Sequence, residues 1–196
     1  MTTGGSEPRF AAYAQTLGRY LLRSPHTIML PDALDRGSLH RFADWPNDAV
    51  PQVAAGVYTI WRGDALMYVG MAGRSLTSDD VARHRSEAAR GKGLFSRLNS
   101  HACGRRSGDQ FCVYVADRLV LPTLAHHQIE AIGRGELAMD GLTRAYIREQ
   151  LTYRFAEASG GAEAREWEAA IRRGALPTGA PLLNPIVRAI SRATAI

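Results

Sequence analysis

The chain has 196 residues, of which 45 % are hydrophobic and 22 % are charged. This composition supports a folded domain with a buried core and excludes a largely disordered chain. The formal net charge is +5, which favours an anionic partner. Residues 1–10 lack the apolar run of a signal peptide, and no stretch has the length and hydrophobicity of a membrane span. We therefore expect a cytoplasmic protein that does not enter a membrane.

The first 50 residues are predicted to form an N-terminal extension. Its apolar residues Phe10, Tyr13, Leu17 and Leu21 recur every three or four positions, which indicates an amphipathic helix over residues 9–23. Residues 24–52 contain several prolines and aspartates and little periodicity, so we expect an irregular arm there.

The next segment predicts a β-hairpin. Residues 56–62 and 65–70 are rich in β-branched and aromatic residues, and Gly63 and Asp64 separate them as a turn. Residues 73–93 are polar, basic and bounded by glycines, so we expect an exposed insertion that is partly helical.

The rest of the chain alternates between helical and extended patterns. We predict helices at 94–102, 123–150 (with a break near 133–135) and 162–173, and strands at 111–115 and 151–157. A hairpin followed by helices and further strands indicates an α/β sandwich with a small central, mainly antiparallel β-sheet flanked by helices.

The positive charge is concentrated in one segment. Between Arg74 and Arg106 there are eight cationic and three acidic residues, so the net charge of this segment equals that of the whole chain. A nucleic-acid backbone suits such a segment, and a solvated arginine-rich loop is the alternative. The cationic residues are Arg74, Arg83, Arg85, Arg90, Lys92, Arg97, Arg105 and Arg106.

Other residues with metal-binding chemistry lack the right pattern. Cys103 and Cys112 form no CxxC pair, so we expect two reduced, structural thiols. His126, His127 and Glu130 have no evident fourth ligand and are predicted to lie on a helix surface.

The predicted hairpin carries a paired motif. Gly56-Val57-Tyr58 lies on its first strand and Tyr68-Val69-Gly70 on its second, with nine residues between the two triplets. This pair resembles the motif of the GIY-YIG nuclease superfamily, and its spacing lies in the usual range of that family. The resemblance extends over about residues 55–186.

Further residues follow in the order typical of that family. Arg97 and His101 lie four residues apart on a predicted helix and therefore share a face. Glu168 lies on the helix after a predicted strand, and Asn184 ends the sequence Pro181-Leu182-Leu183-Asn184. The resemblance implies an active site of Tyr58, Tyr68, Arg97, His101, Glu168 and Asn184.

The spacing departs from the family pattern in two places. Arg97 lies further from Tyr68 than the corresponding arginine usually does, which requires an insertion at about 73–93. The segment 118–150 is also longer than a minimal domain needs. We therefore divide the chain into the extension 1–50 and a nuclease-like domain 51–196 with these two insertions.

The resemblance implies hydrolysis of DNA phosphodiester bonds with one Mg²⁺ or Mn²⁺ ion at Glu168. One carboxylate can hold such an ion together with water and a phosphate oxygen, and the ion stabilises the leaving oxygen. Arg97 suits a bidentate grip on the scissile phosphate. The general base is Tyr58, with a lowered pKa, or His101. Tyr68 would then bind the phosphate or the water, and Asn184 would support the site.

Each of these residues also has an interpretation without chemistry. The tyrosines can pack a half-buried strand face, and Arg97 with His101 can form a solvated helix face. Glu163 and Glu166 compete with Glu168, although Glu163 lies where the helix dipole favours a carboxylate. Each of these explanations can apply to one residue alone. That all of them apply at once, to residues in this order, is the less economical interpretation.

We expect a DNA endonuclease of the restriction, repair or mobile-element type, acting on double-stranded DNA as a monomer or homodimer. Residues 1–50 would enlarge the DNA surface or mediate dimerisation. The alternative is a nucleic-acid-binding module on the same scaffold that does not cleave. The DNA-binding residues outside the active site would be Arg74, Arg83, Arg85, Arg90, Lys92, Arg105 and Arg106.

Overall fold

A four-stranded antiparallel sheet forms the centre of the computed structural model, which describes residues 29–84 and 91–184. The strand order is β1-β6-β3-β4, and each neighbouring pair is antiparallel. This confirms the predicted α/β class with a small, mainly antiparallel sheet. The helix predicted at 9–23 lies outside the described residues. The strands are β1 (His40–Arg41), β3 (Gly56–Arg62), β4 (Ala65–Ala72) and β6 (Thr152–Glu157).

The predicted hairpin is formed by β3 and β4. Gly63 adopts a positive φ of 56° in its two-residue turn, which glycine does without steric cost. Ile60 pairs with Tyr68 but Trp61 pairs with Leu66, so Met67 is the extra residue of a β-bulge. As a result Met67 and Tyr68, although consecutive, both pack against the same layer of the core.

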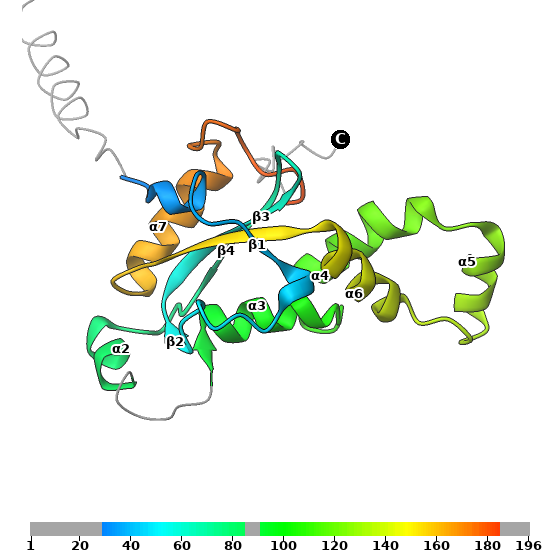
Figure 1. The fold of residues 1–196 in the computed structure, drawn as a ribbon, viewed down its shortest axis with the longest axis horizontal. Helices are drawn as coiled ribbons and strands as arrows, with labels where there is room; N and C mark the ends of the chain where they lie inside the picture. Colours follow the sequence, from blue (N-terminus) through cyan, green and yellow to red (C-terminus); the bar gives the residue numbers. More distant parts are fainter. Residues whose placement is uncertain (1–28, 85–90, 185–196) are drawn as a thin grey trace, which may run out of the picture.

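Helices cover both faces of the sheet (Figure 1). α3 (Leu94–Cys103), α4 (Gln110–Val115) and α6 (Met139–Gln150) lie on one side, and α7 (Gly161–Arg172) lies on the other. Because neighbouring residues of a strand point to opposite faces, β3 contributes to two core clusters. Tyr58 and Ile60 pack in the cluster of α3, α4 and α6, whereas Val57 packs with α7.

Most predicted elements of this core are confirmed. The hairpin, the helix at 94–102, the strand at 151–157 and the helix at 162–173 occur as β3–β4, α3, β6 and α7. The helical segment 123–150 occurs as α5 (His126–Gly133) and α6, with a break after Gly133. The arm before the hairpin also adds the unpredicted strand β1 to the sheet edge beside β6.

The strand predicted at 111–115 is wrong, because this segment is the helix α4. Its β-branched and aromatic residues favour a strand locally. The Asp109 side chain instead accepts hydrogen bonds from the backbone N–H groups of Phe111 and Cys112, which starts a helix. Phe111 and Val115, four residues apart, are then both fully buried against the core. Packing and capping therefore override local propensity here.

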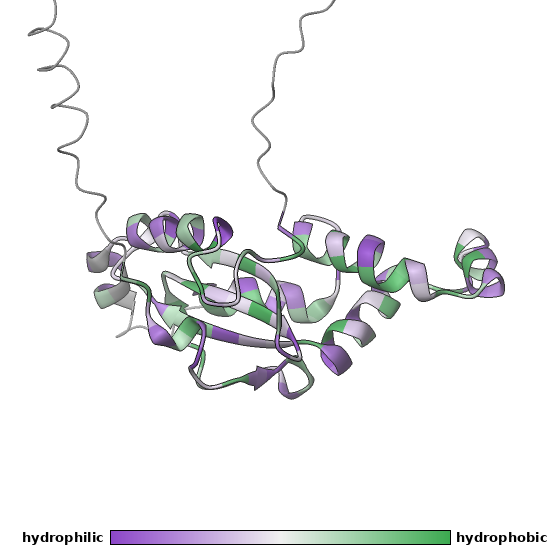
Figure 2. Ribbon diagram, turned by 90° about the horizontal axis from the view of Figure 1, so that it is seen from above, coloured by the Kyte–Doolittle hydropathy of each residue, from purple (hydrophilic) through white to green (hydrophobic). Residues whose placement is uncertain are grey.

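The segment 73–93 contains the short helix α2 (Ser78–His84), in line with a partly helical insertion. Its end is tied to the core, since β5 (Lys92–Gly93) pairs in parallel with β2 (Val53–Ala54). Within the second insertion, residues 118–150, α5 has no buried residue and projects away from the sheet (Figure 2). The remaining short turns are η1 (Asp32–Leu34), η2 (Phe42–Asp44), η3 (Ala116–Val120) and η4 (Leu121–Thr123).

None of the helices within 29–84 and 91–184 has the length and apolar character needed to cross a bilayer. The three tryptophans are buried in the core, where they serve as packing residues: Trp45, Trp61 and Trp167.

The outer edge of β4 is covered by the end of the described chain. The N–H groups of Leu182 and Leu183 donate to the carbonyls of Leu66 and Met67. The Asn184 side chain then continues this pairing, accepting from the N–H of Val69 at 2.8 Å and donating to its carbonyl at 2.9 Å. An unpaired strand edge is thereby closed.

We expect Asn184→Ala to lower the free energy of unfolding by about 2 kcal/mol or more. Each buried backbone group left without a partner costs about 1–3 kcal/mol, and Val69 would lose two partners. Urea denaturation measures this. The control is Leu182→Ala, whose side chain is 56 % exposed and whose backbone bond is unchanged, so its effect should stay within about 0.5 kcal/mol. Equal stability of the two variants would contradict this role of Asn184.

Candidate active site

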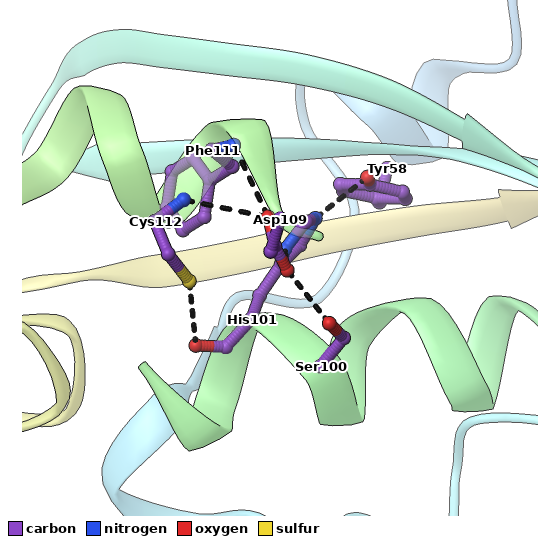
Figure 3. Close-up of polar contacts among 6 residues, drawn as sticks. All are labelled: Tyr58, Ser100, His101, Asp109, Phe111 and Cys112. Carbon is purple, nitrogen blue, oxygen red and sulfur yellow. Dashed lines mark hydrogen bonds and ion pairs between the residues drawn. The ribbon is translucent and has the colours of Figure 1, made fainter. Parts of the chain in front are cut away.

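A chain of short hydrogen bonds joins the centre of the sheet to α3 and the start of α4 (Figure 3). The Tyr58 hydroxyl lies 2.7 Å from Nε2 of His101, and Nδ1 of the same imidazole lies 2.7 Å from Oδ2 of Asp109. The Ser100 hydroxyl donates to the same carboxylate oxygen at 2.8 Å. Phenol, imidazole and carboxylate therefore form one continuous path along which a proton can move.

The side chains of this path are almost completely buried. The relative exposure of Tyr58, His101 and Asp109 is 2 % each. Gly70, directly opposite Tyr58 in the β3–β4 register, leaves the space for the phenol, because a Cβ at Gly70 would collide with the Tyr58 hydroxyl. The lack of space for a Cβ thus explains why the last residue of the motif is a glycine.

Tyr68 stands beside this path on β4. Its ring centroid lies 6.5 Å from that of Tyr58 and 6.2 Å from that of His101, and its side chain is only partly buried. The structure therefore brings Tyr58, Tyr68 and His101 together as the sequence predicts. Tyr68 is the more accessible of the two phenols.

The phenols are held in their protonated form. Burial is the largest cause that raises the pKa of Tyr58 well above its usual value, followed by the neighbouring Tyr68. Arg97 acts in the opposite direction but does not outweigh burial, so Arg97 alone does not lower the pKa of Tyr58. Burial and then the Glu168 charge raise the pKa of Tyr68 to about 12.

His101 is held in its neutral form. Burial is the largest cause that lowers its pKa, and the Arg97 charge adds to this, while Asp109 raises it in part. The pKa of Asp109 is lowered, because the bonds from His101, Ser100 and Cys112 outweigh the opposing effect of burial. At neutral pH the path therefore consists of a neutral phenol, a neutral imidazole and a carboxylate.

Arg97 lies on the exposed side of α3 and lines a pocket of about 320 Å³. Lys92 and Arg74 line the same pocket from the two ends of the segment 73–93. Serine hydroxyl groups complete a polar, cationic wall suited to an anion. The other lining residues are Ala72, Gly73, Ser75, Leu76, Gly91, Gly93, Ser96 and Ser100.

Glu168 approaches from the other face of the sheet. Its helix α7 packs on β3 and β4 on the face opposite α3, so Arg97 and Glu168 come from different layers. The Glu168 carboxylate nevertheless acts on the pKa of both Tyr68 and Tyr58. Its charge thus acts on the two phenols from the α7 side of the sheet.

The surroundings of Glu168 combine burial with positive charge. Burial is the largest cause that raises its pKa, opposed by the charges of Arg172, Arg74 and Arg165. Its ion pair with Nη1 of Arg172 is long, at 4.0 Å, so that contact does not fix the carboxylate as a hydrogen bond would. A side chain that is 19 % exposed can still reach an ion or water.

The two competing glutamates have other surroundings. Glu163 accepts a hydrogen bond from the Ser159 N–H at 2.7 Å and thus stabilises the start of α7. Glu166 is exposed. Of the three, Glu168 is the one that acts on the tyrosine pair.

Asn184 does not touch the proton path. Its hydrogen bonds to Val69 hold the strand that carries Tyr68, which fits the expected supporting role.

The predicted DNA-binding residues are distributed around the pocket and beyond it. Arg74 and Lys92 line it, while Arg83, on α2, and Arg105 are exposed. Arg106 forms an ion pair with Asp140 at 2.7 Å, which is exposed and therefore weak. Two further predicted residues lie outside the described chain: Arg85 and Arg90.

Among the described residues, one group of three potential metal ligands has its donor atoms close together, namely His101, Asp109 and Cys112. These residues are better explained by hydrogen bonding. The carboxylate is engaged by His101 and Ser100, and the Cys112 thiol contacts the His101 carbonyl at 3.7 Å. Burial also raises the pKa of Cys112, which disfavours the thiolate that a metal requires.

Sequence reasoning missed two members of the path, Ser100 and Asp109. Asp109 follows Gly108 and precedes apolar residues, which is an N-cap signal. The strand predicted at 111–115 concealed that signal. Comparisons with protein-family models, with curated proteins and with solved structures gave no match to this chain.

We expect the pH dependence of stability to report the neutral state of His101. Its pKa is lowered by folding, so below its unfolded value of about 6.5 the unfolded chain binds more protons than the folded one. Stability from this group is therefore complete above that pH and is lost as the pH falls toward the folded pKa. Urea unfolding at pH 7.5 and pH 5.0 should show a larger loss for the wild type than for His101→Gln. Parallel losses in the two proteins would show that His101 does not titrate in this way.

Proposed function

We propose that the chain is a metal-dependent endonuclease that hydrolyses DNA phosphodiester bonds. The observation that carries this proposal is the buried path from Tyr58 through His101 to Asp109, together with the cationic pocket that Ser100 and Arg97 line from the same helix. The resemblance of the hairpin motif to GIY-YIG nucleases supports the same function. A proton path beside an anion pocket is what hydrolysis of a phosphodiester requires.

The path supplies a general base without forming a stable phenolate. As water attacks the phosphorus, Tyr58 accepts a proton from the water and passes its own proton to Nε2 of His101. A new P–O bond forms, the bond to the leaving oxygen breaks, and that oxygen takes a proton from solvent. The imidazolium that results is stabilised by Asp109 at 2.7 Å and later releases its proton to solvent. Concerted transfer of this kind fits a phenol whose pKa is raised by burial.

The pocket supplies the phosphate site. The Arg97 guanidinium can hold two phosphate oxygens at once, and Lys92 and Arg74 add charge at the same wall. These contacts follow the DNA backbone and carry no base specificity. Tyr68, the more exposed phenol, would donate a hydrogen bond to the phosphate or to the attacking water.

Glu168 is the residue that would hold a divalent cation. A partly exposed carboxylate with a loose ion pair fits a Mg²⁺ or Mn²⁺ ion whose other ligands are water and phosphate oxygens. Such an ion, when bound, supplies Lewis-acid stabilisation of the leaving oxygen. Among the described residues, the potential ligands that lie close together are His101, Asp109 and Cys112, and the Asp109 carboxylate is already hydrogen-bonded. This favours a single ion, at Glu168.

A nucleic-acid-binding module without cleavage is the second candidate, because the exposed cations of this segment alone would bind a phosphate backbone. The phenol–imidazole–carboxylate path, however, adds acid–base groups that binding alone would not need. That path therefore favours the enzyme.

Cleavage of supercoiled plasmid in Mg²⁺ or Mn²⁺ tests the proposal. We expect the wild type to nick or cut the plasmid and Glu168→Gln to lose at least about 10²-fold in rate, the order seen when one charge-stabilising group is removed from an active site. Glu166→Gln is the matched control, since Glu166 lies on the same helix but is exposed. Its rate should stay near that of the wild type.

Two results would contradict the proposal. If Glu168→Gln and Glu166→Gln cleave alike, Glu168 does not hold the ion. If the wild type cleaves in neither ion but binds DNA with a steep dependence on salt, the binding module is the correct function.

A further inference from the structure

The two oxygens of Asp109 have different partners. Oδ1 accepts from the backbone N–H groups of Phe111 and Cys112, at 3.1 and 3.4 Å, and so caps α4. Oδ2 faces Nδ1 of His101 and the Ser100 hydroxyl. One carboxylate thus fixes a helix start with one oxygen and a catalytic histidine with the other.

The chemistry of this contact determines which ring nitrogen carries the proton. An ionised carboxylate only accepts hydrogen bonds, so a neutral His101 must carry its proton on Nδ1. Nε2 is then an acceptor, and the Tyr58 hydroxyl at 2.7 Å must be the donor. This is the polarity in which Tyr58 can pass a proton to His101.

The charged and titratable groups around His101 agree with that arrangement. Tyr58 and Tyr68 face it from β3 and β4, Arg97 from its own helix, and Asp109 and Cys112 from the start of α4. The Arg97 charge disfavours a positive imidazole. The Asp109 carboxylate is held ionised by hydrogen bonds from His101, Ser100 and the backbone of Cys112, and it disfavours a neutral imidazole whose proton is on Nε2.

We propose that Asp109 is a positioning residue that fixes the tautomer of His101, so that Nε2 is free to take the proton of Tyr58. The catalytic part of this inference rests on the proposed nuclease function. The structural part, the position of the imidazole proton, does not.

Asp109→Asn separates the two tasks of this side chain. Asparagine caps helices as well as aspartate does, so its oxygen is expected to stay at the Oδ1 position and α4 to be retained. The amide NH₂ then falls at the Oδ2 position and donates to Nδ1. His101 must move its proton to Nε2 and donate to Tyr58, which reverses the polarity of the path.

Cleavage should then fall while folding and DNA binding persist. We expect kcat to drop by about 10²–10⁴-fold; the corresponding change in a serine-protease triad lowers kcat by about 10⁴ through the wrong tautomer. KM and the melting temperature should stay near wild type. Asp64→Asn, in the exposed hairpin turn, is the matched control and should cleave like the wild type.

The ¹⁵N chemical shifts of the His101 ring, measured by NMR, test the tautomer without any cleavage assay. The proposal expects the proton on Nδ1 in the wild type and on Nε2 in Asp109→Asn. A proton on Nε2 in the wild type overturns it, even if the variant does not fold. A reversed tautomer with unchanged kcat would falsify the role in the proton path. If the wild type shows the Nδ1 proton but cleaves no DNA, the tautomer assignment holds and the proposed function fails.

Discussion

A phenol cannot remain inside a sheet without a partner for its hydroxyl, and this constraint organises the molecule around Tyr58. The partner is Nε2 of His101 at 2.7 Å, so α3 must pack where it brings His101 next to Tyr58 on β3. The imidazole in turn needs an acceptor for its other nitrogen, and Asp109 supplies it. Three features therefore serve one buried hydroxyl: the packing of α3 on β3, the turn before α4 that carries Asp109, and the absence of a side chain at Gly70.

The site extends beyond one face of the sheet because β4 is its outer strand. α3 contributes Arg97 and His101 from one layer, and α7 contributes Glu168 from the other. The Glu168 charge acts on both phenols from the opposite layer, because Coulombic interactions extend through packed protein. The segment that ends at Asn184 closes the same strand without covering Tyr68, which remains partly exposed. In the proposed nuclease, α7 would contribute the metal ligand and α3 the phosphate contacts.

The sequence was sufficient for the elements whose residues follow one period. The hairpin, α3, β6 and α7 were predicted because apolar spacing, turn residues and burial agree there. The segment 111–115 was mispredicted because its composition favours a strand, whereas a cap from Asp109 and burial on one helical face decide the structure. The same error hid Asp109, and Ser100 was missed because its partner is Asp109. Predicting them required knowledge of which side chain faces His101, which is a property of the packed fold.

The bulge at Met67 has a consequence for the length of this motif. With Tyr58 opposite Gly70 and Ile60 opposite Tyr68, the two phenols are fixed on one side irrespective of what happens closer to the hairpin tip. A sequence one residue shorter, without an equivalent of Met67, would simply pair as a regular ladder and keep both rings in place. The interval between the two tyrosines can therefore differ by one among related hairpins, and an alignment gap at this position need not signal a lost active site.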